Sequence, residues 1–147
     1  MKSAPVFLFI FITLTFFSLT ACNTEMLHAS APIRIKDPWL RWYPETNTAE
    51  LYFYIVNKSD ADETLLEVSS EVAANVEFYN APAGEGFTDV ENVQTIDLPV
   101  ETGFIFLPDG PHLKLTGIEG GLTPGQLVPI TLKFKHAGEH SFYVEAR

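Results

Sequence analysis

Sulfur is scarce in this sequence. Its 147 residues include one cysteine, Cys22, and two methionines, Met1 and Met26. A single cysteine excludes an intramolecular disulfide framework and a zinc site built from several thiolates. Both methionines lie near the start of the chain, so the remainder has no thioether sulfur to offer a soft metal ion.

Basic residues are also few. Nine Lys and Arg residues stand against nineteen Asp and Glu, which gives a formal net charge of −10 at pH 7. Phosphate backbones and anionic lipid surfaces are bound by clustered Lys and Arg. The composition therefore excludes a nucleic-acid-binding protein and a polybasic membrane-binding face, and it is typical of an acidic, soluble surface.

The motifs of the common catalytic classes are missing as well. There is no Ser-His-Asp order with nucleophile-elbow glycines and no glycine-rich phosphate-binding motif. The acidic pairs Asp60/Asp62 and Glu63/Glu67 have the residue types of acid-base catalysis, but in a chain this acidic we expect them to be solvated residues of loops and strand edges. We therefore predict that the protein is not an enzyme.

One long hydrophobic run is present, over residues 5–19, and it follows Lys2. It is too short and too weakly flanked for a permanent bilayer span, so it indicates a secretory signal peptide. The residues after it, Leu19-Thr20-Ala21-Cys22, resemble a bacterial lipobox. That resemblance implies cleavage before Cys22 and its diacylation, whereas the alternative is an ordinary signal peptide that happens to end at a cysteine.

The chain divides into three parts on this interpretation: a signal peptide over residues 1–21, a lipidated flexible tether over 22–32 and one domain over 33–147. Two acyl chains anchor a protein far more stably than one. We expect a protein held to the bacterial envelope by its N-terminal lipid and facing the periplasm. Asn23, in place of aspartate, weakly favours the outer membrane by resemblance to Gram-negative lipoproteins.

Residues 33–147 indicate an all-β domain, because β-branched and aromatic residues recur in short segments between Gly, Pro and Asn. The segment 49–57 is apolar on both faces, which predicts a central strand. Turns with a positive-φ glycine are expected at 122–125 and 136–139. Short strands at this spacing are typical of a sandwich or Greek-key barrel, and they are predicted at 33–42, 49–57, 63–69, 74–80, 92–98, 103–107, 112–116, 128–135 and 140–146.

Six segments in order resemble the periplasmic copper chaperones of the PCuAC family: residues 35–41 (IKDPWLR), 49–57 (AELYFYIVN), 76–79 (VEFY), 107–112 (LPDGPH), 121–125 (GLTPG) and 132–138 (LKFKHAG). The resemblance covers essentially the whole domain. It implies a cupredoxin-like Greek-key β-sandwich, and a role in carrying Cu(I) through the envelope toward the binuclear copper centre of cytochrome oxidase.

The family binds Cu(I) through two histidines and two methionines. At the corresponding spacing this chain has Tyr79, Val90, His112 and Lys114, so only His112 is kept. Cu(I) is a soft ion that favours thioether and imidazole ligands. A phenol is a poor Cu(I) ligand, valine has no donor atom, and an ammonium has no lone pair. The resemblance therefore identifies the family well and supports retained copper binding poorly.

Other donors are few. His136 and His140 flank the predicted turn at 136–139, where their imidazoles could reach one ion, although surface histidines of this kind are more often only solvated. Met26 and His28 offer soft donors in the tether, at the cost of ordering a flexible segment. His112 itself has a plain structural interpretation, as a histidine at the end of a loop hydrogen-bonded to nearby backbone.

Two functions from different classes follow. The first is a lipid-anchored relative of copper chaperones whose own copper binding is weak or lost. The second is an interaction protein without metal, which uses the same sandwich to recognise an envelope copper protein or an oxidase assembly factor.

Overall fold

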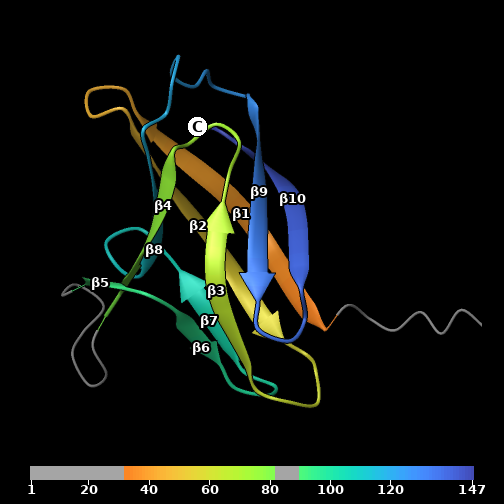
Figure 1. The fold of residues 1–147 in the computed structure, drawn as a ribbon. Helices are drawn as coiled ribbons and strands as arrows, with labels where there is room; N and C mark the ends of the chain where they lie inside the picture. Colours follow the sequence, from red (N-terminus) through yellow and green to blue (C-terminus); the bar gives the residue numbers. More distant parts are fainter. Residues whose placement is uncertain (1–31, 82–89) are drawn as a thin grey trace, which may run out of the picture.

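The computed structural model of the chain describes residues 32–81 and 90–147, and it forms two antiparallel β-sheets packed face to face (Figure 1). The strands are β1 (Ile33–Tyr43), β2 (Thr48–Asn57), β3 (Glu63–Ser69), β4 (Asn75–Asn80), β5 (Glu91–Val93), β6 (Ile96–Leu98), β7 (Gly103–Phe106), β8 (His112–Thr116), β9 (Leu127–Phe134) and β10 (Glu139–Glu145). The all-β sandwich predicted from the sequence is confirmed.

The larger sheet has the order β1-β2-β8-β4-β5, and β7 also pairs with β2. The smaller sheet has the order β10-β9-β3-β6. The predicted central position of the segment 49–57 is confirmed, because β2 pairs with β1 on one side and with β7 and β8 on the other. This position explains why Tyr52 and Val56 are buried although they lie on the face opposite Leu51 and Ile55.

One strand prediction is wrong. The segment 92–98 is not a single strand but two short ones, since β5 pairs with β4 in the larger sheet and β6 pairs with β3 in the smaller sheet. A bend at Gln94 carries the chain from one sheet to the other. Alternation along the sequence does not reveal such a crossing, because both halves keep a pattern that suits a strand.

The core lies between the two sheets and is formed by alternate residues of the strands, whose side chains point inward. On β2 and β8 the residues Leu51, Ile55, Leu113 and Leu115 are fully buried, and the smaller sheet adds Ile130 of β9 among others. Burying one such side chain stabilises the fold by about 1.5–3 kcal/mol. Their inward direction sends the intervening residues of the same strands to the outer face of the sheet.

Both predicted turns are confirmed, with Gly125 at φ 84° and Gly138 at φ 76°. No helix in residues 32–81 or 90–147 combines the length and apolar character that a bilayer span needs. The predicted signal peptide, Cys22 and most of the tether lie outside the described residues.

Glu63 corrects the expectation that the acidic residues of this region are solvated. Asp60, Asp62 and Glu67 are exposed, but Glu63 is 5% exposed. Its carboxylate accepts hydrogen bonds from the backbone N–H groups of Thr64 at 2.8 Å, His136 at 3.0 Å and Ala137 at 2.7 Å. Glu63 therefore ties the start of β3 to the turn between β9 and β10.

The electrostatics of Glu63 follow from these contacts. Burial alone would raise the pKa of the Glu63 carboxyl, but the three backbone N–H groups hold it below its ordinary value. A carboxyl with a lowered pKa in the folded state stabilises the fold above its unfolded pKa of about 4.3. That stabilisation is lost as the pH falls through the folded-state pKa.

We predict that Glu63→Gln lowers the free energy of unfolding by about 1–3 kcal/mol at pH 7, because a buried charge-assisted acceptor is lost. The difference from the wild type shrinks as the pH falls through the folded-state pKa of Glu63. Urea unfolding curves across this pH range measure both effects. The control is Glu67→Gln, whose exposed carboxylate lies 3.7 Å from Lys133 Nζ and whose loss costs less than about 1 kcal/mol. Equal stability of Glu63→Gln and wild type at pH 7 would contradict this account.

Candidate metal site

The candidate site lies on the outer face of the larger sheet, where strands β4, β8 and β2 are neighbours. The register pairs Tyr79 of β4 with His112 of β8, and it pairs Lys114 of β8 with both Glu77 of β4 and Glu50 of β2. All five side chains alternate with buried residues of their strands, so they share the outer face. The structure thus brings together three of the four positions aligned with family ligands.

His112 is held by the loop that precedes it. Its Nδ1 lies 2.7 Å from the backbone carbonyl oxygen of Gly110. The loop is tight, with Asp109 at φ 61° and the Leu107 N–H donating to the Pro111 carbonyl at 2.8 Å. A carbonyl only accepts, so Nδ1 carries the hydrogen, and in the neutral imidazole Nε2 is then the nitrogen with the lone pair. The backbone hydrogen bond expected for a loop-end histidine is thus present at His112.

Tyr79 covers one face of the His112 ring. The two ring centroids are 4.9 Å apart and the planes differ by 7°, so the rings are stacked. The Tyr79 hydroxyl donates to Glu77 Oε2 at 3.0 Å. The hydrogen bond to Glu77 raises the pKa of the Tyr79 phenol, with burial adding to the effect. The neutral phenol that results is a poor ligand for any cation.

Glu50 is the acidic residue that faces His112, and it was not among the site residues predicted from the sequence. Its Oε1 lies 4.0 Å from His112 Nε2, while Oε2 accepts hydrogen bonds from the hydroxyls of Tyr43, at 2.7 Å, and Tyr52. Burial alone would raise the pKa of Glu50. The hydrogen bonds from Tyr52 and Tyr43, with His112 and Arg41 nearby, hold it below its ordinary value. Glu50 is therefore a carboxylate with one oxygen engaged and the other directed at the imidazole.

A signal for Glu50 exists in the sequence, although it is weak. Glu50 is the one acidic residue of the segment 49–57, in which the other residues before Asn57 are apolar or aromatic. What the sequence does not give is the register between β2 and β8, which places Glu50 beside Lys114 and one diagonal step from His112. Tyr43 and Tyr52 were missed for the same reason.

The remaining aligned positions add no donor. Lys114 is half-buried and lies on the same face as His112, so its ammonium adds positive charge to the site. Val90 directly precedes β5, beyond the pairing of Asn80 with Glu91. It is half-buried and has only carbon atoms in its side chain.

The other candidate histidines of the described residues each contact a protein group. His136 Nδ1 lies 3.5 Å from Glu63 Oε1, whereas His140 Nε2 lies 3.2 Å from the Ala137 carbonyl. Each imidazole thus has its own protein partner. Across residues 32–81 and 90–147 no group of three or more His, Cys, Asp or Glu side chains is placed to hold a metal ion. Met26 and His28 lie outside the described residues.

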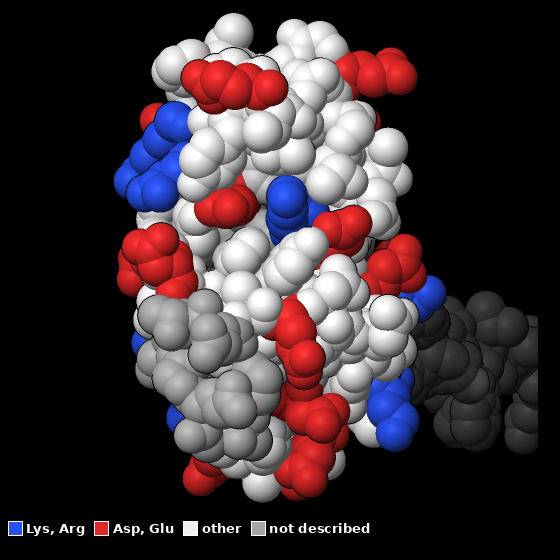
Figure 2. Space-filling model, turned by 90° about the vertical axis from the view of Figure 1, so that its left-hand side faces the viewer, with Lys and Arg blue, Asp and Glu red and all other residues white. Residues whose placement is uncertain are grey.

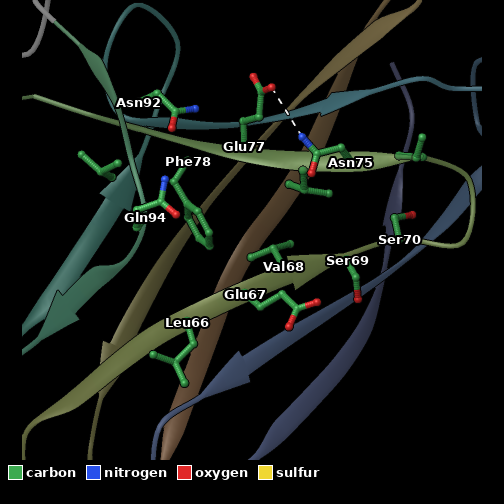
Figure 3. Close-up of a pocket in the computed structure, with 14 residues that line it drawn as sticks. Leu66, Glu67, Val68, Ser69, Ser70, Asn75, Glu77, Phe78, Asn92 and Gln94 are labelled. Carbon is green, nitrogen blue, oxygen red and sulfur yellow. Dashed lines mark hydrogen bonds between the residues drawn. The ribbon is translucent and has the colours of Figure 1, made fainter.

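A groove of about 450 Å³ separates β3 from β4, next to the candidate site (Figure 3). The buried residues Phe78 and Val68 line it, as do Glu67 and Glu77. β5 pairs only with residues 78–80 of β4, and β6 only with residues 63–65 of β3. Within the described part of the chain, residues 75–77 and 66–69 therefore lack a strand partner on the groove side.

The surface around the groove is acidic. Figure 2 shows Asp and Glu side chains spread over the side of the molecule on which β4 and β8 lie, with basic side chains among them. This agrees with the negative net charge of the chain.

The fold defines a class of protein, and comparisons with known proteins identify it. Among solved structures, the copper-bound PCuAC domain from PmoF2 is 30% identical, with a TM-score of 0.66, and the match covers 79% of this chain and 94% of that one. The apo PmoF2 PCuAC domain is also 30% identical, with a TM-score of 0.67 and coverage of 79% and 90%. The sandwich is thus a PCuAC domain with a copper-chaperone-like fold.

The particular family follows from the sequence. The family described as putative lipoprotein LpqE-like matches residues 33–146, and the chain belongs to it. The solution structure of CuI-DR1885 from Deinococcus radiodurans shares the fold at 20% identity, with a TM-score of 0.65 and coverage of 84% and 85%. No curated protein matches the chain. The family resemblance found in the sequence is confirmed.

Proposed function

We propose that this protein is an envelope lipoprotein related to Cu(I) delivery for cytochrome oxidase assembly, and that its own Cu(I) binding is weak or lost. One observation carries the proposal: the family's fold presents His112 with an available Nε2, while the three other aligned positions hold no soft donor. The related PmoF2 domain is described as copper-bound, which supports a copper-related role for the scaffold.

The chemistry of each replaced position supports weak binding. The Tyr79 phenol stays protonated because Glu77 accepts its hydrogen bond. Lys114 brings a positive charge to the face where a cation would bind. Imidazole alone is a single neutral ligand, whereas Cu(I) sites gain their strength from several soft donors. Function depends on the site and not on the scaffold.

A second candidate function is that of an interaction protein that recognises an envelope partner, such as a copper protein or an oxidase assembly factor. The groove between β3 and β4 favours it, because unpaired strand edges border the groove on both sides. An extended peptide can add to such an edge through backbone hydrogen bonds. We infer that copper handling would then rest with the partner.

The proposed location depends on Cys22. We propose that residues 1–21 are removed as a signal peptide, that Cys22 is lipidated, and that residues 22–32 tether the domain to the membrane, with the outer membrane weakly favoured. The family's description as a putative lipoprotein supports this.

We predict that an anaerobic Cu(I) competition titration of the purified protein gives weak binding that is lost in His112→Ala. The reason is that His112 is the only family ligand kept. His140→Ala is the matched control. That imidazole lies 3.2 Å from the Ala137 carbonyl, and it is not one of the four positions aligned with family ligands. Tight one-to-one binding lost in His112→Ala would exclude the interaction-only function. No binding at micromolar Cu(I) would mean that the protein's own Cu(I) binding is lost, and would favour the interaction function.

Restoring the family ligands should restore the affinity. We predict that the triple variant Tyr79→His, Val90→Met and Lys114→Met binds Cu(I) far more tightly than the wild type, since the spacing of the four positions is intact. The same competition titration measures it, and circular dichroism checks folding. A folded triple variant that still bound no Cu(I) would show that these four positions do not converge.

Lipidation has a direct test. Cys22→Ser should block lipid attachment, because serine has no thiol to form the thioether, and the protein should leave the membrane fraction or fail to mature. Metabolic labelling with a fatty acid and membrane fractionation report the two effects. Unchanged labelling in Cys22→Ser would rule out lipidation at this residue.

A further inference from the structure

We propose that the groove between β3 and β4 binds the N-terminal end of a partner protein, as an extended segment of about three residues with a free α-ammonium group. The proposal rests on the interaction function given above and deepens it, because it assigns the chemistry of the segment that is recognised. It involves no metal ion, and His112 is not among the residues that line the groove.

The groove is framed by the chain at both of its ends. Residues 70–74 join β3 to β4 at one end. At the other end the bend at Gln94 crosses between the sheets, because β5 pairs with residues 78–80 of β4 and β6 pairs with residues 63–65 of β3. A long strand added to an open edge runs past both ends of that edge, and here it would meet the protein chain at each end. A chain end, which enters the groove and stops, fits this frame.

The groove has the size of a short extended segment. Its volume is about 450 Å³. Within the described part of the chain, residues 75–77 of β4 lack a strand partner on the groove side, and three residues of a strand extend over about 10 Å. Backbone N–H and C=O groups along such an edge point alternately toward the paired strand and away from it. A segment of about three residues can therefore form backbone hydrogen bonds with this edge.

Apolar side chains in the groove offer a second contact. Figure 3 shows the side chains of Val68 and Phe78 pointing into the space between the two strands. They are 4% and 6% exposed, so most of their surface already packs within the domain. In an extended segment successive side chains point to opposite sides. An apolar side chain of the bound segment can thus face Val68 and Phe78 while its neighbours face solvent.

Charge decides which end of a partner chain fits. Glu67 of β3 and Glu77 of β4 line the groove from opposite sides, and the described residues that line it include no Lys, Arg or His. Lys133 lies 3.7 Å from Glu67 and Lys114 pairs in register with Glu77, but neither lysine lines the groove. The two carboxylates would repel the carboxylate of a C-terminus and attract an N-terminal ammonium, which is protonated below its pKa of about 7.7–8.0.

The test compares two peptides that differ only at the N-terminus. The probe is the amidated peptide Ala-Val-Thr-Gly-Lys with a fluorescent dye on the lysine side chain, with either a free or an acetylated N-terminus. Fluorescence polarisation and backbone amide NMR of the full-length protein in detergent at pH 6.5 measure binding. We expect the free peptide to bind with amide shifts in residues 66–69 and 75–77. Acetylation removes the charge and should weaken binding at least about tenfold.

Variants of the groove test the same contact from the protein side. Glu77→Gln and Glu67→Gln should each weaken binding of the free peptide about threefold and leave that of the acetylated peptide unchanged. Gln94→Trp, at an exposed residue that lines the groove, should block both peptides by occupying the space. Glu139→Gln is the matched control, because it removes an equal charge from an exposed residue of β10 and should change binding less than about twofold. His112→Ala should also leave peptide binding unchanged.

Equal binding of the free and acetylated peptides would overturn the proposal, as would amide shifts confined to strands away from the groove or no binding at millimolar peptide. If a variant does not fold, the comparison of the two peptides on the wild-type protein decides the question.

A photo-crosslinker separates failure of this proposal from failure of the interaction function. It is placed in cells either at Glu71, in the connection at one end of the groove, or at Tyr143 of β10, which is 68% exposed. A partner linked at Glu71 through its own N-terminal residues, as identified by mass spectrometry, would support the proposal. A partner linked only at Tyr143 would overturn it and keep the interaction function, whereas no partner at either position would contradict both.

Discussion

The outer-face site depends on the burial of alternate residues along β2, β4 and β8. Leu51, Leu113 and Leu115 have no exposed surface, and Phe78 of β4 is nearly buried beside them. A slip of one residue in any of these strands would expose its apolar side chains and bury polar ones. The apolar face therefore fixes the register, and the register places Tyr79, His112, Glu77, Lys114 and Glu50 next to one another. The chemistry of the site is a consequence of a core that contains none of its residues.

The outer-face site depends on the core, but the core does not depend on the site. This explains how the ligands could be replaced without loss of the fold. The inner face is closed by hydrocarbon side chains from both sheets, so the core contains no side chain of the outer-face site. The outer-face positions are then free to change chemistry. Stacking of Tyr79 on His112 and the hydrogen bond from Tyr79 to Glu77 supply contacts that a bound ion would otherwise supply. A change in ligand residues thus alters what the face binds before it alters whether the protein folds.

Much of the fold could be predicted from the sequence because its strongest signals are local. Alternation along residues 49–57 and 112–116, and the glycines at 125 and 138, act over a few neighbouring residues. The crossing at Gln94 could not be predicted, because it depends on which strand each half of the segment pairs with. Glu63 was misjudged for a similar reason. Its backbone partners at His136 and Ala137 are far away in sequence, and nothing local distinguishes it from the exposed Glu67. The candidate site could be predicted in part. Spacing in the sequence identified Tyr79, His112 and Lys114, whereas Glu50 could be found only from the pairing of β2 with β8.

The sandwich is held together unequally along its two sides. On one side the chain's last residues join the sheets: Leu40 bridges Ala146, the Arg147 N–H donates to the Leu40 carbonyl at 2.8 Å, and the Trp42 N–H donates to the Arg147 carbonyl at 3.1 Å. On the other side the described strands β3 and β4 border the groove without pairing to each other. Local opening costs least where few backbone hydrogen bonds must break. Thermal fluctuations should therefore separate the two sheets first between β3 and β4, while the sheets stay joined along the β1 and β10 edge. Amide exchange in β3 and β4 should be faster than in β1.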